Sequence, residues 1–550
     1  MKRISIAFYA AALAMTGASA AADPLPGAVD WSGAYVGVHG GGALARLDFA
    51  DPFGTSIFGD TARTTGFLGG IQAGYNWQFG AAVVGLEADA SLANLEGTST
   101  CFAYSGFYVS SYCRTKADRV GTIAGRLGWA LPGDQRTLLF GKGGLAWEHD
   151  SVTAYPNRTE LSSSTRTSGL LWGWVLGGGV ERALNARWSL KAEYDYMRFG
   201  DQAFATPESR FQSVVGHPGK LDVVPQTATA ISQDVQLVKI GLNYRFGADA
   251  NDEPPVEWGT LADGAPPQPS GMLVEAGVRY VRGWGRFQKD QKQRRKPEVL
   301  QSKLTYDNLP SDGGEVFARI DMPFNVMVKG VVGSGSGGST QTMHDEDWGL
   351  DHASGYIPYS NTVSDSGYDL GYYTADAGYD VWRTDATKIA LFGGYSYFKQ
   401  ELKAFGCKQI ADPISDCSGR HVVPTSDLGL TDTDTWRSPR VGIVIDTMIA
   451  PGLTLSGEVA YLPRVKLTAI NHHLLKDEQA PEWGEGNGVQ LEATLSYALT
   501  DTLRFGVGGR YWSMRADGAT LKGGDTIPMH FAAEQAALLV QGSYAFDLQP

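Results

Sequence analysis

The sequence predicts an all-β fold made of two tandem antiparallel transmembrane β-barrels, of about 8 and about 10 strands, joined by a Pro-rich linker. Three observations predict it. Segments of strand length alternate apolar with polar residues, and short turns alternate with long polar loops. The 550 residues include 70 glycines and 11% aromatic but only 19% charged residues. That composition suits strands whose outer face contacts lipid.

The first twenty residues have the pattern of an export signal. Two basic residues precede an apolar run over 4–15, and small residues follow at 18–20. We therefore expect 1–20 to be a removable signal peptide. An anchored helix is the alternative, although the run is too short to span a bilayer. No later stretch approaches the roughly 18 continuous apolar residues of a spanning helix.

Charge and cysteine content exclude other classes. The net charge of −13 argues against nucleic acid as a partner, because phosphates need a basic surface. The four cysteines form two close pairs in an exported chain, which predicts local disulfides Cys101–Cys113 and Cys407–Cys417. Free thiols are the alternative. The spacing excludes a CxxC redox or zinc site.

The first barrel is expected over 31–247, with the last strand showing the pattern most clearly. Val238 and Leu242 alternate with Lys239 and Asn243, so one set suits lipid and the other a polar interior. Acids and bases that share one lumen predict a paired plug rather than a wide channel. A soluble up-and-down barrel would reverse this polarity. The eight expected strands are 33–44, 66–79, 82–95, 118–130, 137–150, 169–183, 187–200 and 234–247.

Segments 31–45, 69–77 and 241–246 of this half resemble the small opacity-type surface antigen barrels of outer membranes. The resemblance covers about 215 residues. It implies a surface-exposed eight-stranded barrel and no defined chemistry.

Residues 248–270 carry five prolines among acidic residues, so we expect a semi-extended spacer. Even strand numbers in each half place both ends of the spacer on the periplasmic side, with the long loops facing outside. A single fused barrel of about 18 strands is the alternative. The expected location is the cell outer membrane.

The second barrel is expected over 271–550, again with tight turns on one side. The long loops are expected near 335–366, 403–435, 468–486 and 516–532. The ten expected strands are 272–288, 299–322, 325–334, 367–382, 387–402, 436–448, 452–467, 487–499, 502–515 and 533–546.

Two motifs beyond strand ends on the long-loop side could carry chemistry. Asp345 and Asp347 share a face in an extended segment, and paired carboxylates can hold a water between them. Asn471 and His473 share a face by the same rule, and a histidine near neutral pH can take a proton from water. A solvated acidic loop and exposed or metal-binding histidines are the plainer interpretations. Both motifs lie at one rim, where they could face each other.

Segments 302–306, 320–322, 345–348 and 391–395 resemble the omptin outer-membrane proteases, and the similarity spans about 272–546. The resemblance implies that Asp345 and Asp347 bind the attacking water and that His473 is the general base. It implies no cofactor, although lipopolysaccharide could be needed for activity. Outer-membrane lipid, lipopolysaccharide and a peptide or protein substrate are the implied partners.

Asn471 departs from the family, which has a carboxylate there to orient the histidine. An amide can accept a hydrogen bond from the ring but cannot stabilise an imidazolium. Either activity is weakened or another acid, Asp477 or Glu478, turns inward. Ala469 and, by a loose alignment, Phe287 replace two acids that favour basic substrates, so dibasic specificity is not supported.

Three functions remain open at this point. The first is a surface endopeptidase, and the second is a non-catalytic surface antigen or structural barrel. The third is a solute pore, which small barrels with filled lumens disfavour.

Overall fold

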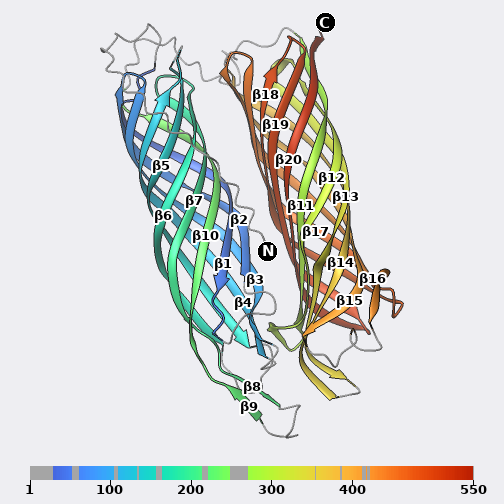
Figure 1. Ribbon diagram of the computed structural model, residues 1–550. Helices are drawn as coiled ribbons and strands as arrows, with labels where there is room; N and C mark the ends of the chain where they lie inside the picture. Colours follow the sequence, from blue (N-terminus) through green and yellow to red (C-terminus); the bar gives the residue numbers. More distant parts are fainter. Residues whose placement is uncertain are drawn as a thin grey trace.

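The computed structural model shows two closed β-barrels lying side by side (Figure 1). No helix in the described part of the chain has the length and apolarity to cross a bilayer. The expected signal peptide and linker lie outside the described residues. The structure describes residues 29–52, 61–104, 109–132, 135–156, 164–212, 221–247, 271–352, 355–383, 387–411, 417 and 422–548.

The first barrel closes when its first strand pairs with its last, with Tyr35 opposite Arg245. A separate two-stranded hairpin, β8 (Ser209–Gln212) with β9 (Leu221–Val224), projects beyond its lower rim in Figure 1. The eight barrel strands are β1 (Gly33–Phe49), β2 (Thr61–Phe79), β3 (Ala82–Tyr104), β4 (Val109–Ala130), β5 (Thr137–Pro156), β6 (Thr165–Ala183), β7 (Trp188–Ala205) and β10 (Ala228–Arg245).

The second barrel closes through β11 and β20, so the single fused barrel considered above is wrong. A short 3-10 turn, η3 (Pro323–Asn325), makes one of its tight connections. Its ten strands are β11 (Met272–Gln293), β12 (Lys296–Asp321), β13 (Val326–His352), β14 (Gly355–Arg383), β15 (Thr387–Ala411), β16 (Val423–Ala450), β17 (Leu453–His473), β18 (Glu478–Ala498), β19 (Leu503–Lys522) and β20 (Asp525–Leu548).

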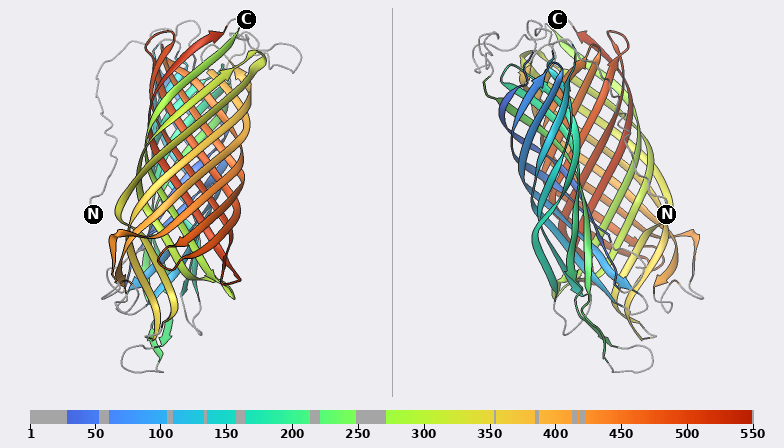
Figure 2. Two further views of the ribbon diagram at one scale, coloured as in Figure 1. Left: turned by 90° about the vertical axis from the view of Figure 1, so that its right-hand side faces the viewer. Right: turned by 60° about the vertical axis from the view of Figure 1, so that its left-hand side comes forward.

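Most strands are longer than the sequence predicted, and nearly all of the added length is on the side of the long connections. Much of the expected loops 335–366, 403–435, 468–486 and 516–532 continues as paired strand. The polar alternation there indicates a sheet in water rather than a loop, because only the membrane-spanning part of a strand needs an apolar face. Both barrels therefore extend well beyond the lipid on that side, and Figure 2 shows their tall, tilted walls.

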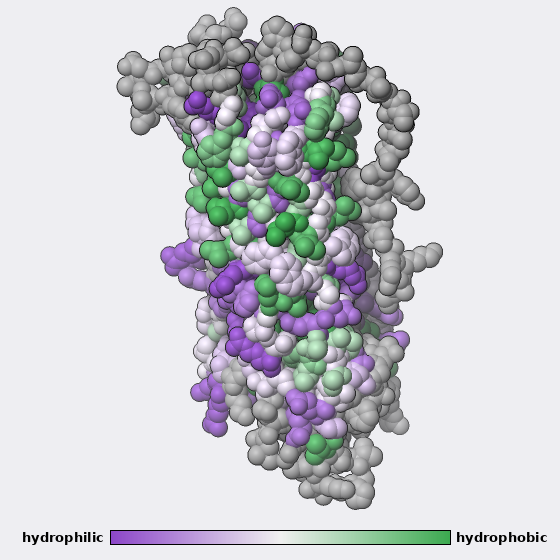
Figure 3. Space-filling view, turned by 90° about the vertical axis from the view of Figure 1, so that its left-hand side faces the viewer, coloured by the Kyte–Doolittle hydropathy of each residue, from purple (hydrophilic) through white to green (hydrophobic). Residues whose placement is uncertain are grey.

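The outer face of the first barrel carries a lipid-facing apolar band. Ile71, Leu86, Leu127 and Leu176 are each more than half exposed. Figure 3 shows hydrophobic residues gathered over the upper half of this face, the half nearer the short turns, with more hydrophilic residues below. The alternation predicted for the last strand is confirmed, since Val238 is exposed and Lys239 is buried in the lumen.

The membrane-level lumen of the first barrel is filled by ion pairs. Lys239 bonds to Asp195 at 2.8 Å and Asp89 at 3.3 Å, and Lys191 bonds to Glu87 at 2.8 Å. These side chains are at most 2% exposed. The predicted charge plug is confirmed over the described residues, and it leaves no wide water channel at this level.

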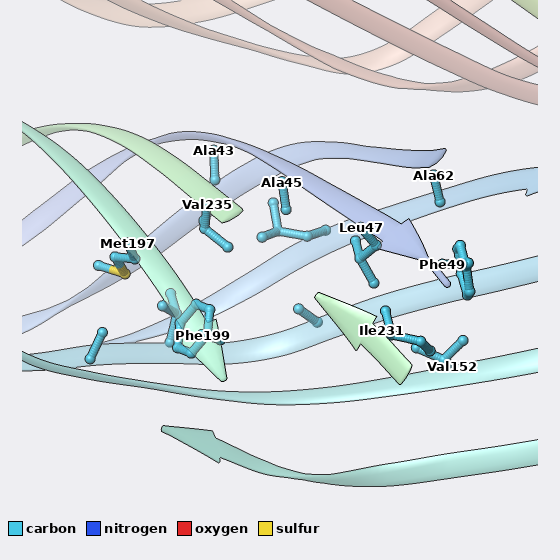
Figure 4. Packing of buried hydrophobic residues seen from close by; sticks show 14 of the residues in the cluster. Ala43, Ala45, Leu47, Phe49, Ala62, Val152, Met197, Phe199, Ile231 and Val235 are labelled. Carbon is cyan, nitrogen blue, oxygen red and sulfur yellow. The ribbon is translucent and has the colours of Figure 1, made fainter. Parts of the chain in front are cut away.

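The half of the same lumen that lies farther from the short turns, called here the outer half, is mainly apolar, which the sequence pattern did not reveal. Leu47, Phe49 and Ile231 belong to a buried cluster that points into the barrel (Figure 4). The Cys101–Cys113 disulfide lies within this cluster and joins β3 to β4. Above the lipid, the barrel therefore packs its interior like a water-soluble β-protein.

The second barrel repeats this layering with a different outer end. Near the short turns, buried charges pair across the lumen, as Arg510 does with Glu315 at 2.7 Å. A buried apolar layer that includes Phe287, Tyr306 and Trp512 follows. Beyond that layer the lumen opens into a cavity, whose floor is therefore closed toward the membrane.

The two barrels contact each other along their length. Phe67 of β2 packs against Tyr461 of β17, with ring centroids 5.9 Å apart. Closer to the outer end, the Thr65 and Ser513 hydroxyls lie 2.7 Å apart. The linker is thus not the sole connection between the halves.

The charge plug yields a stability prediction. Lys239→Met should lower the free energy of unfolding by about 3–5 kcal/mol, because Asp89 and Asp195 would then share the single buried cation Lys142. Urea unfolding of the full chain in phospholipid vesicles, followed by tryptophan fluorescence, measures this. Lys116→Met is the matched control, since Lys116 pairs with Glu96 on the surface and its side chain is 50% exposed. The control should change stability by no more than about 1 kcal/mol. Equal effects of the two substitutions would contradict a plug held by ion pairs.

Candidate functional site

The cavity at the outer end of the second barrel collects all four predicted site residues. Asp345 and Asp347 come from β13, and Asn471 and His473 come from β17. All four line one space of about 570 Å³. They lie on strands rather than on the loops that the sequence predicted, and alternation along each strand turns both members of a pair to the same side.

The cavity lies outside the lipid. On β13 the last strongly exposed apolar residue of the band is Val332, and Asp345 follows it by thirteen residues. That is roughly 40 Å along a strand, more than a tilted strand needs to leave the apolar band. The cavity residues therefore face water, although burial within the barrel reduces their hydration.

The acidic side of the cavity consists of Asp345 and Asp347. Burial raises the pKa of Asp345 well above its usual range, and the neighbouring charge of Asp347 raises it further. Two carboxylates that repel each other in this way favour sharing one proton. Between them on the chain, Glu346 points out of the barrel instead.

The opposite side holds His473 in a neutral state. Burial lowers its pKa to about 4, with the positive charges of Lys289 and Lys522 contributing, while Asp432 opposes the shift. A ring with this pKa is a weak base at neutral pH. Glu478 lies opposite His473 in the ladder and also lines the cavity.

Asn471 is bonded to an acid that the local sequence pattern did not reveal. Asp432 of β16 lies opposite Asn471 in the ladder, and the Asn471 amide donates to it at 2.8 Å. The same carboxylate oxygen accepts from Lys289 at 2.5 Å. A carboxylate therefore lies beside position 471 on the neighbouring strand, although position 471 itself has none. This carboxylate is already bonded to the Lys289 ammonium group.

Further charged residues lie in the cavity wall and below it. Lys289 of β11 also contacts Glu482 of β18 at 3.2 Å, and burial raises the pKa of Glu482 to about 6. Below them, Asp434 accepts from Gln400 at 2.8 Å. The Thr-Asp-Thr-Asp-Thr alternation over 431–435 was the signal that could have placed these acids on a strand facing inward.

The remaining sequence candidates separate into two groups. Asp477 does not turn inward, because its side chain is 96% exposed and lies 3.5 Å from His472. Ala469 and Phe287 lie in the apolar layer that closes the cavity floor. A floor of this kind offers no anionic pocket for a basic side chain at those two positions.

One group of three carboxylates in the described part of the chain is close enough to share a metal ion. It consists of Glu87, Asp89 and Glu193 in the first barrel. Lys191 and Lys239 already bond to these acids. The group is therefore a neutralised part of the charge plug.

The second disulfide borders the cavity. Cys407 at the outer end of β15 is bonded to Cys417, with Cα atoms 5.5 Å apart, and both residues line the cavity. The cross-link ties the connection after β15 to the cavity wall.

A closed barrel with a lipid-facing apolar band and a charged lumen defines the class: an integral β-barrel protein of the outer membrane. Residues 8–246 match the family model described as an outer membrane protein beta-barrel domain. The chain is 31% identical over 232 residues to the 31 kDa outer-membrane immunogenic protein of Brucella melitensis, covering 84% of that protein and 39% of this chain. The chain therefore belongs to this family of outer-membrane β-barrel proteins, through its first barrel.

A second relative agrees with this assignment. The 22 kDa outer membrane protein of Rhizobium leguminosarum is 29% identical over 189 residues, with 74% of that protein and 34% of this chain covered. Among solved structures, the outer membrane protease OmpT from Escherichia coli aligns with 50% of this chain and 97% of its own. The TM-score is 0.40 and the identity 12%, so this likeness carries no argument about activity.

The environment of His473 predicts a pH effect on stability. Its pKa is about 4 when folded, against an ordinary 6.5, so the unfolded chain binds the extra proton first as pH falls. The contribution of neutral His473 to the free energy of unfolding is fully present above pH 6.5 and is lost as pH falls toward 4. Wild type should therefore lose stability more steeply than His473→Gln across this window, while the two behave alike above pH 7.

Urea midpoints of the full chain in vesicles between pH 4 and 8 measure the difference. His149→Gln serves as the control, because the His149 side chain is 37% exposed and contacts Asp118 on the surface. If the urea midpoints of wild type and His473→Gln change in parallel with pH, His473 is not held neutral by its surroundings.

Proposed function

We propose that this chain is a non-catalytic surface protein of the outer membrane, whose two barrels present a tall polar structure to the exterior. The observation that carries the proposal is the extension of both barrels beyond the apolar band. The filled lumens disfavour a pore. The word immunogenic in the name of the Brucella relatives supports surface exposure.

Outer-membrane lipid and lipopolysaccharide are the partners that this proposal names. Exposed basic residues occur on the outer parts of the strands, and Lys and Arg bind phosphate groups well. Arg464 and Lys466 of β17 have side chains that are 63% and 58% exposed, and together they outnumber Glu485, the one acid with which both pair. They follow Tyr461 on the same strand, where an outer-leaflet headgroup would lie.

A peptidase in the second barrel is the alternative function, and the shared cavity is the observation that favours it. A water held by Asp345 and Asp347 would attack the peptide carbonyl, and His473 would take the proton that the water loses. The proton would then pass to the leaving amine as the C–N bond breaks. The cavity is wide enough for a peptide side chain and closed from below.

Two features place the peptidase second. Asn471 cannot supply the negative charge that stabilises a protonated His473. Asp432, the acid behind it, is bonded to Lys289, which also lowers the pKa of His473. The histidine therefore lacks the anionic support that a general base needs.

The surface proposal predicts an orientation. A cysteine introduced by Ser426→Cys, at the outer end of β16, should react with a membrane-impermeant maleimide on intact cells. Asp501→Cys, in the short β18–β19 turn, should react only after the outer membrane is opened. Gel shift with a polyethylene-glycol maleimide measures both. Labelling of Asp501→Cys alone on intact cells would reverse the orientation and overturn the proposal.

Peptide cleavage separates the two functions. Wild type, His473→Ala and Asn471→Asp, each refolded with lipopolysaccharide, should leave a random peptide library uncut, as read by mass spectrometry. Cleavage by wild type that is lost in His473→Ala would establish the peptidase instead. Cleavage by Asn471→Asp alone would show that the cavity needs only the orienting carboxylate, and that the natural chain is inactive for want of it.

A further inference from the structure

The outer ends of the two barrels meet at a buried polar contact, called here the outer seam. It comprises Thr98, Thr100 and Tyr112 of the first barrel and Gln288, Asp290, Lys303 and Glu346 of the second. Thr98 donates to Asp290 at 2.6 Å and Thr100 donates to Glu346 at 2.9 Å. Asp290 and Glu346 are fully buried. Each also accepts a bond from its own barrel, from Gln288 at 2.8 Å and from Tyr359 at 2.9 Å, so the first barrel supplies a second donor to each acid.

The seam residues of the second barrel alternate with residues that line the cavity. Glu346 lies between Asp345 and Asp347 on β13. Lys303 lies between Ser302 and Leu304 on β12, and Asp290 lies between Lys289 and Gln291 on β11. All six flanking residues line the cavity. Three adjacent strands thus carry cavity side chains on one face and seam side chains on the other.

A disulfide stabilises the first-barrel side of the outer seam. Cys101 follows Thr100 and Cys113 follows Tyr112, and the disulfide between them lies inside the first barrel. The cross-link fixes the two strands whose outward residues reach the second barrel. Tyr112 packs with Leu300, Trp348 and Tyr359 in a small buried cluster across the contact.

We infer that the first barrel is a positioning partner of the second, which holds the outer faces of β11, β12 and β13 and thereby fixes the cavity carboxylates and Lys289. Each hydrogen-bond donor lost from a fully buried acid costs free energy, so loss of the seam would loosen these strand segments. The inference concerns the shape of the cavity and does not depend on whether the cavity cleaves peptides.

The first test asks whether the barrels dock in the membrane as described. Thr65→Cys with Ser513→Cys, in the full chain with its native disulfides, should form a new cross-link under mild oxidation, because the two hydroxyls are 2.7 Å apart. Peptide mapping without reduction identifies the linked pair. Failure of this pair to link would overturn the inference, whatever the second test shows.

The second test asks whether the seam orders the cavity. Thr98→Val with Thr100→Val removes both hydroxyl donors and keeps the side-chain shape. Hydrogen–deuterium exchange of the full chain in vesicles should rise several-fold in peptides covering 343–349 and 287–291, and stay unchanged in 326–336 near the short turns.

Thr61→Val is the matched control, since Thr61 donates to Asp48 at 2.6 Å inside the first barrel alone. It should leave exchange over 343–349 unchanged. Glu346→Met removes the acceptor of the Thr100 bond at similar side-chain length, and should raise exchange over 343–349 in the same way, independently of any folding defect in the double variant. Unchanged exchange over 343–349 in both seam variants, with the cross-link present, would show that the barrels touch without the first shaping the second.

Discussion

Every backbone amide in the membrane must find a hydrogen-bond partner other than water, and this requirement determines the architecture of the molecule. In the lipid, strands satisfy this requirement only when the sheet closes into a barrel. The last strand of each half of the chain must therefore pair with its first strand. Tyr35 opposite Arg245 and Leu273 opposite Asp547 mark the two closures. Once closure is imposed, each strand has one face toward lipid and one toward a narrow lumen, and the charge plugs and apolar layers are the ways in which the lumen is filled.

The barrel passes from lipid into water along its axis, and this change of solvent explains why its interior is charged at one level and apolar at the other. At membrane level the outside is apolar, so the charged residues are inside and must pair, as Lys239 and Asp195 do. Above the membrane the outside faces water, and the interior of the first barrel becomes a hydrophobic core around Cys101–Cys113. The second barrel keeps a polar interior at that height and has a cavity there. The difference between the halves therefore lies in their outer ends.

The sequence predicted the class of fold because alternation is a local signal. Val238 and Lys239 already indicate which face meets lipid, and both disulfide pairs are close in sequence. Strand ends were missed where polar residues alternate with other polar residues, as over 431–435. The four predicted site residues do share one cavity, but Asp432 and Lys289 depend on which strand pairs with which and in what register. That information is distributed over the whole barrel, and local patterns do not contain it.

The two-faced strands β11, β12 and β13 constrain how the protein can change in evolution. A single-residue deletion between Val332 and Asp345 would exchange the inward and outward sets on that strand, so Glu346 would enter the cavity and its two neighbouring acids would face the first barrel. Length variation in these strands should therefore be tolerated in steps of two residues, or where a bulge absorbs the odd one, such as the irregularity between Ser339 and Met343. Homologous two-barrel chains should keep the parity of this segment even where its amino acids differ.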